Sequence, residues 1–90
     1  MDVEFDPEKD TENIRKHGIS LQRAEDFDFD AAIFDIDDSQ DYGEVRWNGV
    51  GFLGARLYSL TFTELEEGVI RVISLRRAAT EESNRYEQAY

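Results

Sequence analysis

The stretch Arg56–Arg77, RLYSLTFTELEEGVIRVISLRR, decides the fold of this 90-residue chain. Its first half alternates apolar and polar residues over residues 58–63, and its second half is a largely apolar run, both of which are typical of β-strands. Between them, Glu66-Glu67-Gly68 is typical of a tight turn. We therefore predict an antiparallel hairpin with strands at 56–64 and 69–77. The second strand carries apolar residues on both faces, so we expect it to be central in its sheet.

Two further strands are predicted before this hairpin. Residues 32–37 alternate, with Asp35 and Asp37 on one polar face, and a polar loop separates them from a second strand at 44–53. Residues 3–5 are either a short edge strand or a lead-in to the next element. The core of the sheet is thus expected to be four antiparallel strands.

A helix is predicted at 7–17. Asp6 can accept hydrogen bonds from the free amides of the first turn, and Gly18 is typical of a left-handed helix stop. The stripe that faces inward is partly polar, because helical spacing puts on it Asp10, Asn13, Ile14 and His17. A purely structural interpretation has Asn13 and His17 bonded to neighbouring loops, with His17 half-buried.

Two more helices complete the predicted domain. Ser20 caps a second helix at about 21–28, and a last helix spans 81–89. The order of helix, helix, four antiparallel strands and helix predicts one α+β domain over residues 1–90, with helices packed on a meander.

The composition excludes several classes of protein. The chain has no cysteine, which excludes disulfides, thiolate zinc sites and cysteine nucleophiles. No apolar run approaches the ~20 residues of a membrane span, and the first residues do not resemble a secretory signal. No glycine-rich phosphate-binding loop occurs. We expect a cytoplasmic protein that needs no cofactor and does not bind a membrane.

The net charge of −11 is unevenly distributed. Residues 1–45 hold 15 acids and 4 bases, whereas residues 46–90 hold 6 acids and 6 arginines. A local basic patch can therefore exist in the second half. One acidic cluster lacks the spacing of an EF-hand loop, so we interpret it as a solvated loop rather than a metal site: Asp35, Asp37, Asp38 and Asp41.

Most of the arginines in the second half lie on stretches predicted to be strands of one sheet: Arg46, Arg71, Arg76 and Arg77. They can be paired with Glu44 and Glu64, which is the structural interpretation. They can also surround a phosphate, because guanidinium groups bind phosphate with two hydrogen bonds and stay charged.

Three blocks of the sequence together resemble the BrnT-type toxin family. They are DPEK and NIRKHGISL within residues 6–21, EVRWNGVG at 44–51, and RVISLRRA at 71–78, followed by Glu82 and Tyr86. The resemblance implies a RelE-like ribonuclease fold and the toxin half of a type II toxin–antitoxin pair, which inhibits translation by cutting RNA. It also implies a BrnA-like antitoxin with a ribbon-helix-helix part, through which alone the pair binds operator DNA.

The resemblance also implies roles for individual residues. Those implied to be catalytic are His17, Lys16, Arg46 and Arg76. Those implied to bind RNA or phosphate are Arg71, Ser74, Arg77, Trp47 and Tyr58. Trp47 and Tyr58 could stack on bases, although we favour core packing for Trp47.

Our mechanistic hypothesis is metal-independent cleavage by the 2′-hydroxyl of the RNA itself. An imidazole can donate or accept a proton near neutral pH, so His17 can act as acid or base. The arginines would stabilise the charge that develops on the phosphate. The partner group of His17 stays open among Lys16, Glu44, Glu64 and Tyr86.

The acidic composition motivates two alternatives. One is a non-catalytic family member that acts as a regulatory or protein-binding module. The other is an acidic module that mimics nucleic acid and binds a basic partner. A toxin should arrest growth when it is expressed without its partner, whereas a module should not.

Overall fold

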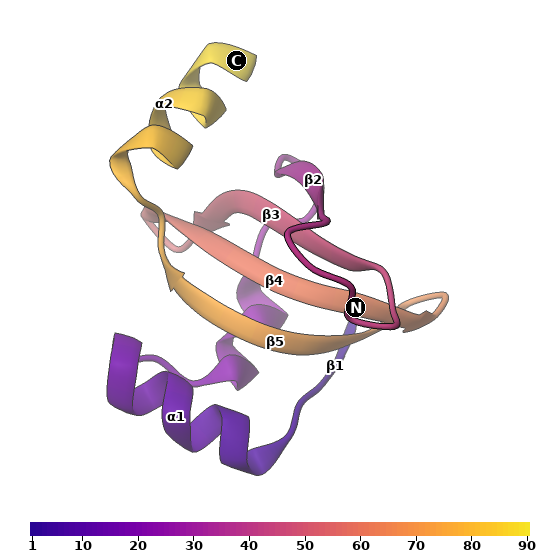
Figure 1. Ribbon diagram of the computed structural model, residues 1–90. Coiled ribbons are helices and arrows are strands. Elements are labelled where there is room, and N and C mark those ends of the chain that lie inside the picture. The colour runs from indigo at the N-terminus through magenta and orange to yellow at the C-terminus, as the bar shows by residue number, and fades with distance from the viewer.

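In the computed structural model, which describes residues 1–90, five strands form one mixed sheet in the order β1-β5-β4-β3-β2 (Figure 1). The strands are β1 (Asp2–Glu4), β2 (Ile33–Asp37), β3 (Arg46–Leu53), β4 (Arg56–Glu66) and β5 (Val69–Arg77). Each of β2, β3 and β4 pairs antiparallel with the next strand along the chain. The predicted meander and its hairpin are therefore confirmed.

The sheet differs from the prediction in two respects. β1 pairs in parallel with β5 through Val3 and Ile70, so the sheet has five strands and is not purely antiparallel. A segment of three residues is too short to show an alternating pattern, and its pairing depends on a partner 67 positions away. β5 is an interior strand, as expected, but the middle of the sheet is β4.

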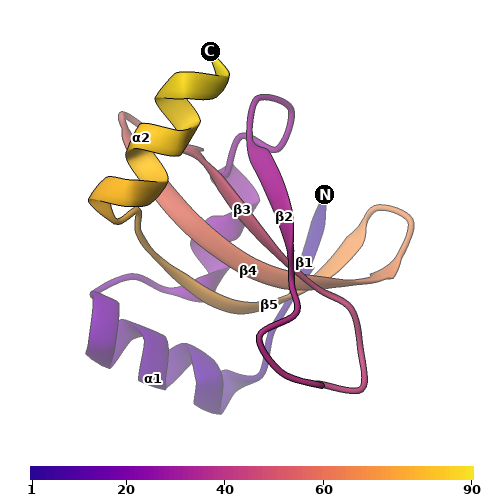
Figure 2. The same cartoon turned by 45° about the horizontal axis from the view of Figure 1, so that its top comes forward.

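The two α-helices begin and end close to the predicted positions. α1 (Pro7–His17) is capped by Asp6, whose carboxylate accepts a hydrogen bond from the Glu8 amide at 2.9 Å, and it ends at Gly18 with φ of 71°. α2 (Thr80–Ala89) begins one residue earlier than predicted. α1 lies beside β5 and α2 contacts β3, on opposite sides of the sheet (Figures 1 and 2). Neither helix has the length and apolarity of a membrane-spanning segment.

The predicted second α-helix is instead a shorter 3-10 helix, η1 (Leu21–Asp26). Its apolar residues are spaced by three, and a 3-10 helix with three residues per turn places Leu21 and Ala24 on one face. Both are fully buried. The start is fixed by Asp10 of α1, whose carboxylate accepts hydrogen bonds from the Ser20 hydroxyl at 2.9 Å and the Leu21 amide at 2.7 Å.

The core lies on one face of the sheet, which we call the apolar face. Its nine buried members are Leu21, Ala24, Phe27, Leu53, Leu60, Phe62, Ile70, Val72 and Leu75. Burial of each large aliphatic or aromatic side chain contributes about 1.5–3 kcal/mol. The opposite face, which we call the polar face, carries Arg46, Asn48, Ser59, Thr61 and Arg76. The sheet therefore leaves one face available for polar chemistry.

A side chain, rather than a strand, closes the outer edge of β5 beyond the end of β1. The Asn13 amide nitrogen donates to the Leu75 carbonyl at 2.8 Å, and the Leu75 amide donates to the Asn13 side-chain oxygen at 3.1 Å. Asn13 also donates to the Ile19 carbonyl at 2.9 Å and is only 5% exposed. The structural interpretation of Asn13 is confirmed. That of His17 is wrong, because His17 at the end of α1 is exposed and bonds to no loop.

Candidate active site

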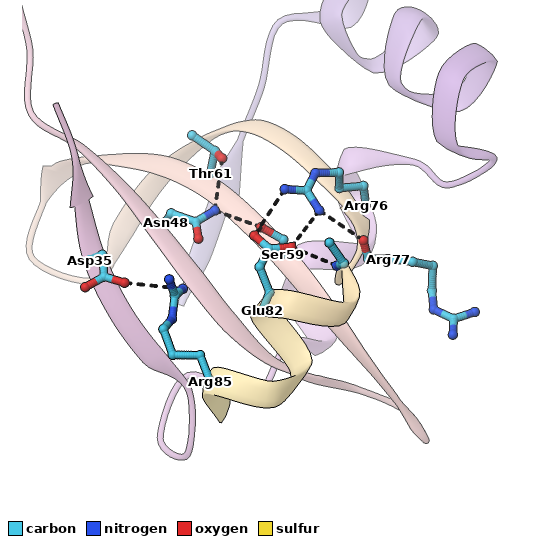
Figure 3. Close-up of polar contacts among 9 residues, drawn as sticks. Asp35, Asn48, Ser59, Thr61, Arg76, Arg77, Glu82 and Arg85 are labelled. Atoms are coloured by element: carbon cyan, nitrogen blue, oxygen red, sulfur yellow. Dashed lines mark hydrogen bonds and ion pairs between the residues drawn. The ribbon is translucent and has the colours of Figure 1, made fainter. Parts of the chain in front are cut away.

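The polar face brings together side chains from three strands because alternate residues of each strand point to the same side. Asn48 donates to the Ser59 hydroxyl at 2.8 Å, and its amide lies 3.5 Å from the Thr61 hydroxyl (Figure 3). Arg76 is in register with Ser59, and Ser74 with Thr61. The face is thus a connected polar surface rather than a set of separate solvated residues.

Arg76 is held by Glu82 of α2. Its two terminal nitrogens lie 2.7 and 3.1 Å from the two Glu82 oxygens, so the pair is bidentate (Figure 3). The same carboxylate accepts hydrogen bonds from the Ser59 hydroxyl at 3.1 Å and the Ala79 amide at 2.8 Å. Burial acts to raise the pKa of Glu82, but these hydrogen bonds and the Arg76 charge outweigh it and lower the pKa. Glu82 therefore stays ionised and orients the guanidinium.

Glu44 joins two more arginines across the sheet. One of its oxygens lies 3.2 Å from Arg46 of β3, and the other accepts a hydrogen bond from Arg71 of β5. The Arg46 guanidinium also lies over the Tyr42 ring, 3.8 Å from the ring centroid. Glu44 is thus the counter-ion that the sequence suggested, whereas Glu64 forms no ion pair.

A shallow groove runs between α1 and the outer edge of β5. One part, of about 250 Å³, is lined by Asp6, Lys9, Arg71, Val72 and Ile73. The other, of about 230 Å³, is lined by Lys9, Glu12, Asn13, Lys16, His17, Ile73 and Ser74. The two parts share Lys9 and Ile73, so we treat them as one feature, the edge groove. It connects the end of α1 with Arg71, and through Ser74 it reaches the polar face.

Lys16 and His17 line one end of the edge groove, and only Lys16 has an ionic partner. The Lys16 ammonium lies 3.4 Å from the Glu12 carboxylate, which it shares with Arg15. The hydrogen bond from Arg15 is the main cause that lowers the pKa of Glu12 to about 2. His17 is exposed and has no hydrogen-bonding partner, so its ring is free to contact a ligand.

The remaining predicted contacts lie on the other side of the sheet. Trp47 and Tyr58 pack against the core from the apolar face, which confirms the favoured interpretation of Trp47. The Arg77 guanidinium carbon is 5.9 Å from the centroid of the Tyr58 ring and points away from Arg76 (Figure 3). The structure therefore brings α1 and β5 together along the edge groove, but it places Arg76 and Arg77 on opposite faces of the sheet.

The four candidates for the second proton-transfer group, which would act together with His17, differ in their surroundings. Tyr86 is buried against Phe52, and burial is the main cause that raises its pKa. Glu64 lines an apolar pocket on the far face. Glu44 lies between two guanidinium groups, and Lys16 lines the edge groove. Only Glu44 and Lys16 are therefore placed beside the arginines or His17.

Sequence reasoning did not identify three features of this region. Lys9 lies in the edge groove, and its spacing of four from Asn13 and seven from Lys16 was a signal for a shared helix face. Glu82 as the counter-ion of Arg76 could be anticipated only from the position of α2. Asp35 of the acidic cluster pairs with Arg85 of α2 at 3.3 Å (Figure 3). No three His, Asp or Glu side chains are arranged to hold a metal ion.

Comparisons with known proteins bear on the fold and the family. Residues 5–82 match the family described as "Ribonuclease toxin, BrnT, of type II toxin-antitoxin system". A crystal structure of the ribonuclease toxin BrnT from Brucella abortus is similar, with a TM-score of 0.66 and 24% sequence identity. The similarity covers 89% of this chain and 99% of that chain, and at this identity it supports the fold alone. A search of curated proteins found no match.

Proposed function

The chain belongs to the BrnT family of ribonuclease toxins of type II toxin–antitoxin systems, and from that premise we propose that it is a metal-independent RNA endonuclease that inhibits translation. The observation that supports the proposal is a set of three arginines that carboxylates hold on the polar face, Arg46, Arg71 and Arg76, of which Arg71 also lines the edge groove. Guanidinium groups fixed by carboxylates are preorganised to bind phosphate, so little reorganisation is needed when charge develops on it.

The proposed reaction is an attack of the ribose 2′-hydroxyl on the adjacent phosphorus. The bond between O2′ and phosphorus forms and the bond from phosphorus to O5′ breaks, which leaves a 2′,3′-cyclic phosphate and a 5′-hydroxyl. One group removes the 2′-hydroxyl proton and a second protonates O5′. We assign one of these transfers to His17 and the other to Glu44 or Lys16. The arginines stabilise the extra negative charge of the phosphorane.

Cleavage of a labelled RNA in EDTA tests this reaction. We expect 2′,3′-cyclic ends from the wild-type protein, and a rate lower by about 100-fold or more in Arg46→Ala, because one positioned charge is worth roughly that much. His17→Ala should lose a similar factor if it transfers a proton, about 100-fold or more. Arg56→Ala, which removes an exposed charge at the β3–β4 turn, is the matched control and should cleave normally.

Two results would contradict the proposal. Equal cleavage by all four proteins would identify a contaminating nuclease. Folded protein that gives no cleavage, with isolated RNA or with ribosomes, would reject the enzyme. In the second case, growth arrest on expression without a partner should also be absent.

We further propose that a BrnA-like antitoxin with a ribbon-helix-helix part neutralises the toxin, and that the pair binds operator DNA only through the antitoxin. Acidic groups of such a partner would replace the carboxylates that now pair with the arginines. Co-purification of the protein encoded beside this chain tests the partnership. Failure of the two proteins to co-purify at low salt would contradict it.

A non-catalytic, regulatory family member is the second candidate. Two observations favour it: Arg46, Arg71 and Arg76 all have carboxylate partners within the chain, and the net charge is −11. Such a protein would bind the antitoxin and affect transcription without cleaving RNA. Binding with neither cleavage nor growth arrest would select this candidate.

A further inference from the structure

An apolar pocket opens on the apolar face, on the opposite side of the sheet from Arg76. It has a volume of about 340 Å³ and is lined by Met1, Phe29, Phe34, Trp47, Phe62, Ile70 and Glu64. Six of these seven residues are hydrophobic. The pocket is a continuation of the core that η1 and α1 leave uncovered.

Aromatic contacts shape the wall of the pocket. The Phe34 ring is stacked 6.4 Å from Phe29 and meets Phe62 edge-on at 6.0 Å, between ring centroids. Phe34 can lie flat there because its strand partner is Gly49, where an added Cβ would come within 2.7 Å of the ring. The wall is therefore formed before any ligand arrives, which lowers the entropic cost of binding.

Large apolar side chains are exposed at the mouth of this pocket, by which we mean the lining residues Met1 and Phe34 and the neighbouring Ile36, which is not itself a lining residue. Met1 is 59% exposed, Phe34 39% and Ile36 57%, and Ile36 is in register with Trp47 on the same face. Isolated exposed apolar residues are ordinary, but a contiguous patch with a polar rim marks an interaction surface. Aromatic residues and methionine are also the types enriched at protein interfaces.

The surroundings of the pocket are acidic. Glu64 lines it, and three exposed acids are adjacent in sequence to lining residues: Asp2, Asp28 and Asp30. None of these four forms an ion pair. The neighbouring bases Arg46 and Arg71 instead bind Glu44. The one positive group among the lining residues is the N-terminal ammonium of Met1, which these four acids outnumber. The field at the mouth is therefore negative, which disfavours both RNA and a second copy of this chain with its net charge of −11.

We propose that this pocket is the docking site of the antitoxin, which inserts a segment with bulky apolar side chains flanked by Lys or Arg. The inference rests on the proposed function, because it takes the partner to be the antitoxin of the same pair. It adds that the anchoring contact lies on the apolar face, away from Arg76. Docking and RNA cleavage are then separable by substitution.

The test is calorimetric titration of the toxin with the purified protein encoded beside it. Ile36→Lys puts a charge at the mouth of the pocket, and Ile14→Lys makes the same change at a residue of α1 that is 46% exposed. Ile36→Lys should weaken binding about 30-fold, as loss of an interface hot spot does, and Ile14→Lys should not. Because Ile36 is exposed, both variants should fold and cleave RNA as the wild type does.

A second pair of variants tests the charge. Glu64→Lys should slow association about tenfold at low salt, whereas Glu25→Lys, a reversal at an exposed position of η1, should change it far less. Trp47 is the only tryptophan and lines the pocket, so its fluorescence should shift when a tryptophan-free basic peptide from the partner binds.

Any of three outcomes overturns the docking site. Equal affinities of Ile36→Lys and Ile14→Lys would place the partner elsewhere. A wild-type dimer that Ile36→Lys dissociates would identify a second copy as the occupant, and loss of RNA binding by Ile36→Lys would identify RNA. Failure of the proposed function is distinguished by the cleavage assay: pocket binding with no cleavage by the free toxin rejects the enzyme and keeps the docking site.

Discussion

The two faces of the sheet are built from the same strands but differ in role: the apolar face holds the core, and the polar face holds paired charges and hydrogen-bonded side chains. In β4, Leu60 is fully buried on the apolar face, while its neighbours Ser59 and Thr61 join the hydrogen bonds of the polar face. The apolar face is stabilised by area removed from water. The polar face holds ions that are each paired and only partly exposed, such as Arg76 with Glu82. Adjacent residues of one strand can therefore be used to separate stability from chemistry.

The largest difference between the faces is expected in stability. Leu60→Ala should lower the free energy of unfolding by about 3–5 kcal/mol, because it leaves a cavity in the core. Thr61→Ala loses only a long contact with Asn48 and should cost about 0.5 kcal/mol or less. Urea unfolding of both variants measures the contrast, and equal losses would show that the polar face is also part of the core.

The next contrast concerns activity, at two consecutive arginines. Arg76→Ala should slow RNA cleavage by about 100- to 1000-fold, because it removes a charge that Glu82 holds in place. Arg77→Ala removes the same charge from the other side of β5 and should leave the rate nearly unchanged. Initial rates with one RNA decide it. A large loss in Arg77→Ala would mean that RNA also contacts the apolar face.

A smaller effect is expected where α1 closes the edge of β5 between the two faces. Asn13→Ala leaves the Leu75 amide and carbonyl without partners in a buried place and should cost about 1–3 kcal/mol. Asn13→Asp keeps the acceptor for the Leu75 amide but loses the donor. Because Asn13→Asp also sets a carboxylate oxygen against the Leu75 and Ile19 carbonyls in a buried place, thermal unfolding should show it at least as unstable as Asn13→Ala at neutral pH. Equal stability of all three would reject this role of the side chain.

The smallest effect is a dependence of stability on pH at the polar face. The pKa of Glu82 is lowered from 4.5, despite burial, by its bonds to Arg76, Ala79 and Ser59. The group therefore contributes stability that is complete above the unfolded value and is lost as the pH falls through the folded value. Tm should thus fall less between pH 7 and about pH 3 in Glu82→Gln than in wild type. An identical decrease in both would contradict the assignment.

Local patterns predicted most of the elements correctly. Asp6 and Gly18 mark the two ends of α1 through interactions within a few residues. The alternation within Arg56–Arg77 shows which residues of β4 face the core. Short segments were less predictable: β1 pairs with a distant strand, and η1 has too few residues to show whether its period is 3.0 or 3.6. Helical spacing puts His17 on the stripe of α1 that is predicted to face inward, but His17 is exposed. Only tertiary packing decides how much of that stripe is buried.

The sequence by itself determined the α+β class, the meander and the main helix boundaries, because these depend on contacts between near neighbours in the chain. Only the tertiary structure decided which arginines share a face. Arg71 and Arg76 are five residues apart, a spacing that would put them on opposite faces of a regular strand, and they share the polar face because the register of β4 and β5 shifts between Thr61 and Phe62. Glu82 reaches Arg76 because α2 packs over the polar face, and Lys9 and His17 meet the edge of β5 because Asn13 ties α1 there. Such pairings are set by long-range packing, which no local pattern records.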